Sequence, residues 1–181
     1  GSTIITYTLG TGCYTTTAVT VNNVPSVITG STAVCGGSSI ALTDTTTGGT
    51  WTSSNSGIAS VGSLTGVVTG VSSGIVTITY MLTATGCFTT YTVTVNPLPL
   101  GIAGTPIVCV GSTTTLIASG GRVWTSSNTL VATIGSSTGI VAGVSAGTSV
   151  ITYTLGTGCF AVTMVTVNPL PSSITGPSRV C

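Results

Sequence analysis

Charge is nearly absent from this chain of 181 residues, which carries two basic side chains, one acidic side chain and no His. Acid–base catalysis needs a titratable group poised near the working pH, metal centres need clustered His, Cys or carboxylates, and nucleic-acid binding needs a basic face. Because Asp44, Arg122 and Arg179 are the only charged side chains, the sequence predicts no enzyme, no metal site, no cofactor and no nucleic-acid partner.

The first predicted element is a hairpin over residues 3–21, with the turn in Tyr7-Thr-Leu-Gly-Thr-Gly-Cys13. After it, runs that alternate apolar and hydroxyl side chains are separated by clusters of Gly and Asn, which indicates strands with one buried and one solvated face. The strands of the first full repeat are predicted at 27–35, 38–44, 50–54, 58–62, 66–72, 75–82 and 88–95. No segment has a helical period.

The same pattern returns in the second half of the chain. Trp51-Thr-Ser-Ser-Asn55 returns as Trp124-Thr-Ser-Ser-Asn128, and the cysteines Cys13, Cys87 and Cys159 are separated by 74 and 72 residues. A period of this length predicts an array of small domains, each about the size of one sandwich. The predicted fold class is therefore all-β, with tandem sandwiches of about seven strands each.

Two stretches of each repeat resemble a known family. Trp51-Thr-Ser-Ser-Asn-Ser-Gly-Ile-Ala-Ser-Val61 with Gly66-Val-Val-Thr-Gly-Val-Ser-Ser-Gly-Ile-Val-Thr-Ile-Thr-Tyr80, and the matching residues 124–134 with 139–147, resemble the bacterial Ig-like domain of group 2 (BIG2). The resemblance implies tandem Ig-like sandwiches on a large surface or secreted protein, as in intimin- and invasin-like adhesins, and it brings no catalytic residues. The Val-Asn-Pro-Leu-Pro linkers and the Cys pairs also resemble very long repeat proteins of Bacteroidetes.

The predicted organisation has four parts. Residues 1–23 are the C-terminal hairpin of a preceding Ig-like repeat, 24–98 are the first whole repeat, 99–170 are the second, and 171–181 are the first strand of a following repeat. Residues 1–35 match 147–181 at an offset of 146. We therefore expect the chain to be a window of a longer repeat protein.

Four aromatic residues are predicted to belong to the core. Trp51 and Trp124 lie on the third strand of each repeat, where an inward Trp fills the space between two sheets; the alternative is an exposed Trp that stacks on a sugar. Tyr80 and Tyr153 are expected to pack inward with the hydroxyl at the rim.

A pair of glycines in each repeat is expected to serve turns or bulges that need a positive φ or a close approach of the backbone. The pairs are Gly70 with Gly74 and Gly143 with Gly147. Val71 and Val144, which lie between the glycines of each pair, are expected to point into the core.

The six regularly spaced cysteines predict disulfides in an extracellular chain, with free thiols or a metal site as the alternative. Cys35 and Cys109 lie in the first turn of each repeat, and Cys87 and Cys159 lie in the last hairpin. With seven alternating strands these turns are at opposite ends of one sandwich. A strand of eight residues spans about 26 Å, whereas bridged Cα atoms lie within about 7 Å.

The preferred pairing therefore joins two domains, Cys35 with Cys159. Cys13 and Cys87 are then expected to bond to an earlier domain, and Cys109 and Cys181 to a later one. Two alternatives stay open. One is pairing within a domain, such as Cys35 with Cys87; the other is pairing at a constant spacing of 22 residues, which joins 13 with 35, 87 with 109 and 159 with 181.

The predicted linkers between repeats contain the prolines Pro97, Pro99, Pro169 and Pro171. Proline removes an amide donor and restricts the backbone, so these linkers are expected to be stiff.

We expect a structural segment of an extracellular filament or stalk, at the cell surface or secreted, whose partners are copies of itself or adjacent repeats. The alternative is an adhesin repeat region that binds a host or environmental ligand. The many Ser and Thr hydroxyls offer sites for O-linked glycans, and no apolar run is long enough for a membrane span.

Overall fold

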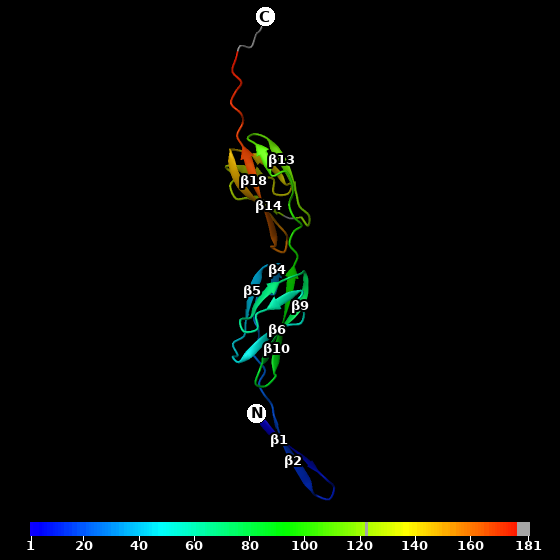
Figure 1. Ribbon diagram of the computed structural model, residues 1–181. Coiled ribbons are helices and arrows are strands. Elements are labelled where there is room, and N and C mark those ends of the chain that lie inside the picture. The colour runs from blue at the N-terminus through cyan, green and yellow to red at the C-terminus, as the bar shows by residue number, and fades with distance from the viewer. Residues whose placement is uncertain (122, 177–181) are drawn as a thin grey trace. The chain divides into compact units, whose positions relative to one another are not determined.

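The computed structural model describes residues 1–121 and 123–176, and all regular elements in these ranges are β-strands. The chain divides into two compact units, Gly1–Asn96 and Pro97–Cys181, which run from blue to green and from green to red in Figure 1. The predicted all-β class is confirmed. Each unit contains one sandwich, and the first unit also contains the N-terminal hairpin.

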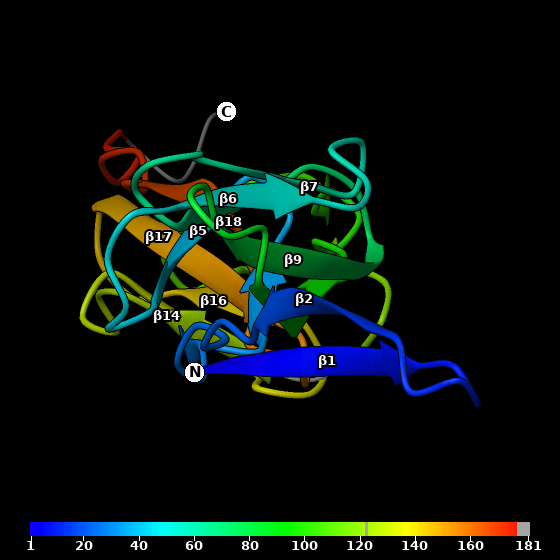
Figure 2. The same ribbon diagram turned by 90° about the horizontal axis from the view of Figure 1, so that it is seen from below.

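The sandwich of the first unit consists of two four-stranded sheets. One has the order β4-β10-β9-β6, which are Ala33–Cys35, Phe88–Asn96, Gly74–Leu82 and Gly49–Ser53. The other has the order β3-β5-β8-β7, which are Thr29–Gly30, Ser39–Thr43, Val67–Gly70 and Ala59–Val61. The antiparallel neighbours β6 and β9 can be followed in Figure 2. The predicted β-sandwich is confirmed.

Strand β9 shows why these sequences form a sandwich. In its central part Val76, Ile78 and Tyr80 alternate with Thr residues, and these three side chains are buried while the Thr residues between them are partly exposed. Side chains of a strand alternate between the two faces, so this spacing gives β9 one face for the core. Its Thr residues suit the outer face, because β-branched side chains fit the pleat.

The first strand of the repeat differs from the prediction of one strand over 27–35. It is split in two: β3 pairs antiparallel with β5 in one sheet, and β4 pairs parallel with β10 in the other. At Gly30, the last residue of β3, φ is 143° and a Cβ would lie 2.7 Å from the carbonyl oxygen of Ala41. The chain therefore crosses close to β5 at a residue without a side chain, and it changes sheets there.

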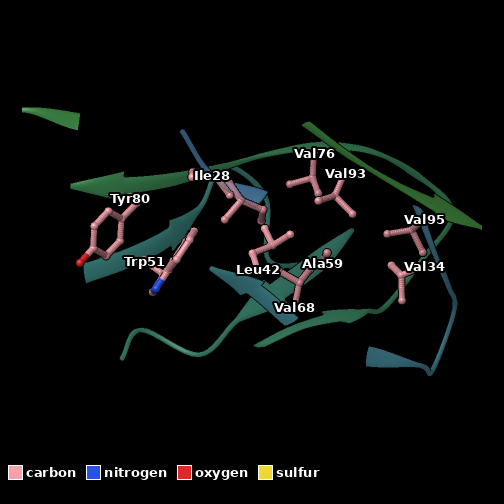
Figure 3. Close-up of a cluster of buried hydrophobic side chains, with 11 residues drawn as sticks. Ile28, Val34, Leu42, Trp51, Ala59, Val68, Val76, Tyr80, Val93 and Val95 are labelled. Atoms are coloured by element: carbon pink, nitrogen blue, oxygen red, sulfur yellow. The ribbon is translucent and has the colours of Figure 1, made fainter. Parts of the chain in front are cut away.

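The core lies between the two sheets (Figure 3). Val76, Val93 and Val95 come from one sheet, and Leu42 and Val68 face them from the other. All five side chains are at most 2% exposed. Burying a side chain of this size stabilises the fold by about 1.5–3 kcal/mol, so this contact between the sheets is the main source of stability in the unit.

The second unit has the same strand order. One sheet is β12-β18-β17-β14, which are Ile107–Cys109, Phe160–Asn168, Gly147–Thr154 and Val123–Ser126. The other is β11-β13-β16-β15, which are Ala103–Gly104, Thr113–Ile117, Ile140–Gly143 and Ala132–Ile134. Its core is built from the matching side chains, including Leu116, Trp124, Val141, Ile151 and Val165.

The N-terminal hairpin is a separate two-stranded sheet of β1 (Ser2–Thr8) and β2 (Tyr14–Thr20). The strands pair antiparallel, with Tyr7 opposite Thr15. Every residue of both strands is exposed. The hairpin therefore has the strand pairing of a repeat without the burial that accompanies it elsewhere in the chain.

The prediction that Val71 and Val144 point into the core is wrong, because they are 57% and 48% exposed. Val71 lies in the turn after β8, and its amide donates to the carbonyl of Ile58, whose side chain packs against the core instead. The expected close approach at Gly70 is present. A Cβ there would lie 2.8 Å from the carbonyl oxygen of Cys35, so the neighbouring turn leaves no room for a side chain.

Candidate functional site: the cysteine turns

Cys35 is the last residue of β4 and begins a turn tied to the end of the sandwich. The amide of Gly36 donates to the carbonyl of Asn96 at 3.0 Å, and the amide of Gly37 donates to the carbonyl of Gly70 at 2.8 Å. The amide of Ser38 closes the turn on the carbonyl of Cys35 at 3.0 Å. These bonds fix the position of Cys35, which is partly buried and disulfide-bonded.

Cys109 lies in the matching turn of the second unit. The amide of Val110 donates to the carbonyl of Asn168 at 3.0 Å, and the amide of Ser112 donates to the carbonyl of Cys109 at 3.0 Å. The backbone of this turn therefore repeats that of the first unit. The thiol differs, because Cys109 is exposed and free.

The hairpin cysteines form the second set. In each hairpin a Leu amide donates to the carbonyl of the cysteine, at 2.8 Å for Cys13, 2.9 Å for Cys87 and 2.8 Å for Cys159. Cys159 is fully buried and disulfide-bonded. Cys13 is exposed and free, and Cys87 is partly exposed and free. Cys181 lies outside the described residues.

Strand β10 separates the two kinds of cysteine turn within a unit. Cys35 pairs with Asn96 at the end of β10, whereas Cys87 directly precedes the first residue of this nine-residue strand. A strand of this length spans about 27 Å, far more than the reach of a disulfide. Cys35 therefore has no access to Cys87. The pairs at a spacing of 22 residues, 13 with 35 and 87 with 109, are not formed either, because Cys13, Cys87 and Cys109 are free.

The two tryptophans are core residues in this structure and not an exposed surface for sugars. Trp51 lies opposite Tyr80 on neighbouring strands, with ring centroids 4.7 Å apart and an interplanar angle of 44°. Trp124 and Tyr153 repeat this pair at 4.6 Å and 46°. All four side chains are buried, and tilted aromatic pairs of this kind add to the energy of burial.

The hydroxyl of Tyr80 is used within its own unit. It donates to the carbonyl of Thr46 at 2.7 Å and accepts from the amide of Gly49 at 3.0 Å. These two bonds tie the loop before β6 to β9. The hydroxyl therefore supports a loop and is not available to a ligand.

The linker prolines occupy different environments. Pro97 begins the second unit and is exposed, whereas Pro99 is buried. Pro169 and Pro171, which follow β18, are exposed. The burial of Pro99 shows that part of the linker belongs to a packed region, which the sequence did not indicate.

Asp44 is the one charged side chain that the structure describes, since Arg122 and Arg179 lie outside the described residues. Its Oδ1 accepts a hydrogen bond from the amide of Thr46 at 2.7 Å. Its Oδ2 is buried and has no hydrogen-bond partner among the described residues. An oxygen of an ionised carboxylate that loses water without gaining a donor destabilises the fold.

We expect the Asp44→Asn substitution to raise the free energy of unfolding at neutral pH by about 1 kcal/mol. The amide keeps an oxygen for the bond from Thr46 and removes the charge. Chemical denaturation of both proteins measures the change. Asp44→Ala is the control that also removes the bond from Thr46, and Ala118 occupies this position in the second unit. A less stable Asp44→Asn protein would show that Oδ2 has a favourable partner.

Within the described ranges, no three side chains of the His, Cys, Asp or Glu type lie close enough to hold a metal ion together. The same part of the chain contains no helix of the length and apolar character needed to cross a membrane.

Comparison with known structures finds several that are similar to this chain. A C-terminal 282-residue fragment of intimin, solved in complex with the intimin-binding domain of its translocated receptor, is 19% identical, with 81% of this chain and 65% of that fragment covered and a TM-score of 0.53. Domains 4 and 5 of the S-layer protein SbsC are 21% identical, with 82% of this chain and 100% of that chain covered and a TM-score of 0.37. Drosophila N-cadherin EC1-4 is 13% identical, with 93% of this chain and 57% of that chain covered and a TM-score of 0.34. No family model and no curated protein matches the sequence.

The chain thus spans less than two thirds of the intimin fragment, and at this identity the similarity shows the fold alone. What it establishes is an Ig-like β-sandwich. The cysteine turns, the aromatic pairs and the hairpin are features of this chain itself.

One face of the N-terminal hairpin is apolar, formed by Ile5, Tyr7, Val19 and Val21, and the sequence patterns of single residues do not reveal it. All four are exposed. The signal was present in the sequence, because the offset of 146 that links the two ends of the chain also aligns these residues with core residues of the second unit.

Proposed function

We propose that this chain is a non-catalytic structural segment of an extracellular filament or surface stalk built from tandem Ig-like domains, with whole repeats at 24–98 and 99–170. The observation that carries the proposal is the pair of sandwiches with one strand order, whose cysteines lie in the turns at the ends of the strands. Residues at the ends of a sandwich are the ones that a neighbouring domain can reach.

We propose further that Cys35 is bonded to Cys159, so that a disulfide joins one repeat to the next. Both residues are disulfide-bonded, while Cys13, Cys87 and Cys109 are free. Strand length argues against a partner for Cys35 within its own sandwich. A bond across the joint would hold two repeats together when one of them unfolds under load.

The free cysteines are consistent with disulfides between adjacent repeats. Cys109 lies in the same kind of turn as Cys35, and Cys13 and Cys87 lie in the same kind of hairpin as Cys159. In a longer array, each would find its partner in an adjacent repeat. A disulfide-bonded chain of this kind belongs in an oxidising compartment, which supports an extracellular location.

Immunogold electron microscopy of source cells, with antibodies raised against this chain, tests the proposal. We expect label along extracellular fibres or stalks and none inside the cell. Label restricted to the cytoplasm, or to separate molecules that never form a fibre or stalk, would overturn it. Loss of cell adhesion after substitution of a single loop would instead favour the adhesin role, a ligand-binding role in the manner of the intimin fragment, which was solved with its receptor domain.

A further inference from the structure

The N-terminal hairpin aligns with the last hairpin of the second unit without a gap, and most of the aligned residues are identical. Residues 1–22 align with 147–168 at an offset of 146, and the apolar face of the hairpin is conserved in identity between the two copies. The strand register is the same as well. Tyr7 lies opposite Thr15 in the first hairpin, and Tyr153 lies opposite Ala161 in the second.

The two copies differ in burial. The matched residues are Ile5 and Ile151 (53% and 0% exposed), Tyr7 and Tyr153 (67% and 2%), Val19 and Val165 (42% and 0%), and Val21 and Val167 (65% and 1%). The same side chains thus form a core in one place and face solvent in the other. An apolar surface left open in this way marks an interaction site.

The edges of the hairpin are open too. In the second unit the outer edge of β17 pairs with β14, and the outer edge of β18 pairs with β12. Within the described part of the chain, β1 and β2 pair only with each other. Open strand edges carry unpaired amides and carbonyls, which favour the addition of further strands.

We propose that the hairpin is a docking surface for a polypeptide segment of the same type as residues 97–146, joined directly ahead of Gly1. This inference rests on the proposed repeat architecture and adds its partner. The segment supplies a facing sheet like β11-β13-β16-β15 for the apolar face of the hairpin. It also supplies one strand for each open edge.

The established pairing of the second unit fixes the register. A strand like β14 adds antiparallel to β1 with its Trp opposite Tyr7, as Trp124 lies opposite Tyr153. A strand like β12 adds parallel to β2 with its Cys beside Asn22, as Cys109 lies beside Asn168. A hollow lined by Tyr7, Leu9, Cys13, Tyr14 and Thr15 lies on the hairpin near the expected position of that Trp.

A second copy of the chain fits less well as the occupant. Its two facing sheets are already covered, one by β9 and β10 and the other by β17 and β18. A segment in the same polypeptide fits the connection better. In the second unit, β16 ends at Gly143 and β17 begins at Gly147, so the facing sheet runs into its hairpin through a short turn.

The test is a chain in which an additional copy of residues 97–146 directly precedes Gly1. Hydrogen exchange followed by mass spectrometry reports on the amides of β1 and β2 in the original and extended chains. We expect exchange in β1 to slow by about 100-fold or more on extension, to the level of β17 in the same molecule. Unchanged exchange in β1, with β17 still protected, would overturn the proposal.

Two further chains separate docking from a general effect of added length. In one, the added copy of Trp124 is replaced by Ser, and we expect β1 to lose most of its protection. In the other, a Gly/Ser segment of equal length replaces the added copy, and β1 is expected to exchange as in the original chain. Equal protection in the Gly/Ser chain would contradict docking.

A final arm tests the source of the segment. The separate polypeptide 97–146 is mixed with the original chain. If it protects β1 while the fused copy does not, the occupant is a different molecule and the proposed position ahead of Gly1 is wrong. All readouts use single molecules in solution, so they do not depend on fibre formation, and a failure of the filament proposal leaves them unaffected.

Discussion

Replacing Trp51 with alanine is expected to lower the free energy of unfolding of the first unit by about 3–5 kcal/mol. The indole is 5% exposed and packs on the ring of Tyr80 at a centroid distance of 4.7 Å. The substitution removes this contact and leaves a cavity between the two sheets, which the neighbouring β-branched side chains fill only in part. The whole free energy of unfolding of a small domain is only about 5–15 kcal/mol, so this loss is a large part of it.

Unfolding of the variant can be followed in each unit separately. Trp124 becomes the only tryptophan, so its fluorescence reports on the second unit, while hydrogen exchange in β9 reports on the first. We expect β9 to lose protection while the fluorescence transition keeps its midpoint. Leu64→Ala, at a side chain that is 82% exposed, is the matched control and should change neither. A stable first unit without Trp51 would show that the aromatic pair is not central to the core.

Much of the fold could be predicted from the sequence because its signals are local. The alternation of Val, Ile and Tyr with Thr in 75–82 predicts a strand with one buried face, and β9 is such a strand. The Trp in the third strand likewise lies in the core. These features depend on strand periodicity, which each short segment carries by itself.

The features that could not be predicted depend on contacts between distant segments. The division of the first strand into β3 and β4 follows from the approach of Gly30 to β5. The exposure of Val71 follows from a hydrogen bond to Ile58, a contact across a turn. The isolated oxygen of Asp44 likewise reflects the packing of its loop. None of these contacts leaves a periodic pattern in the sequence.

The cysteines depend both on local sequence signals and on contacts between distant segments. Spacing assigns them to two kinds of turn, and the backbone bonds around Cys35 and Cys109 are the same in both units. The sequence gives no reason for these two to differ, yet one is disulfide-bonded and the other is free. The difference depends on what lies near each turn, so the chain carries its own matched control for the effect of the bond.

We expect the Cys35→Ser substitution to lower the free energy of unfolding by about 2–4 kcal/mol under oxidising conditions. A disulfide restricts the unfolded chain, and a bond from Cys35 to Cys159 encloses most of both units. Cys109→Ser, in the equivalent turn with a free thiol, should leave the stability within about 0.5 kcal/mol. With a reducing agent present, the original chain and the Cys35→Ser variant should unfold together.

A double-mutant cycle identifies the partner of Cys35. If Cys35 and Cys159 share one bond, that bond is already absent in a Cys35→Ser background. Adding Cys159→Ala should then lower the free energy of unfolding only by the effect of a smaller side chain in the buried site. If the two cysteines belong to separate bonds, the two substitutions should lower the free energy of unfolding additively. A non-reduced peptide map gives the direct answer, and we expect one cross-linked pair that contains Cys35 and Cys159. Any other partner for Cys35 would remove the proposed covalent link between repeats.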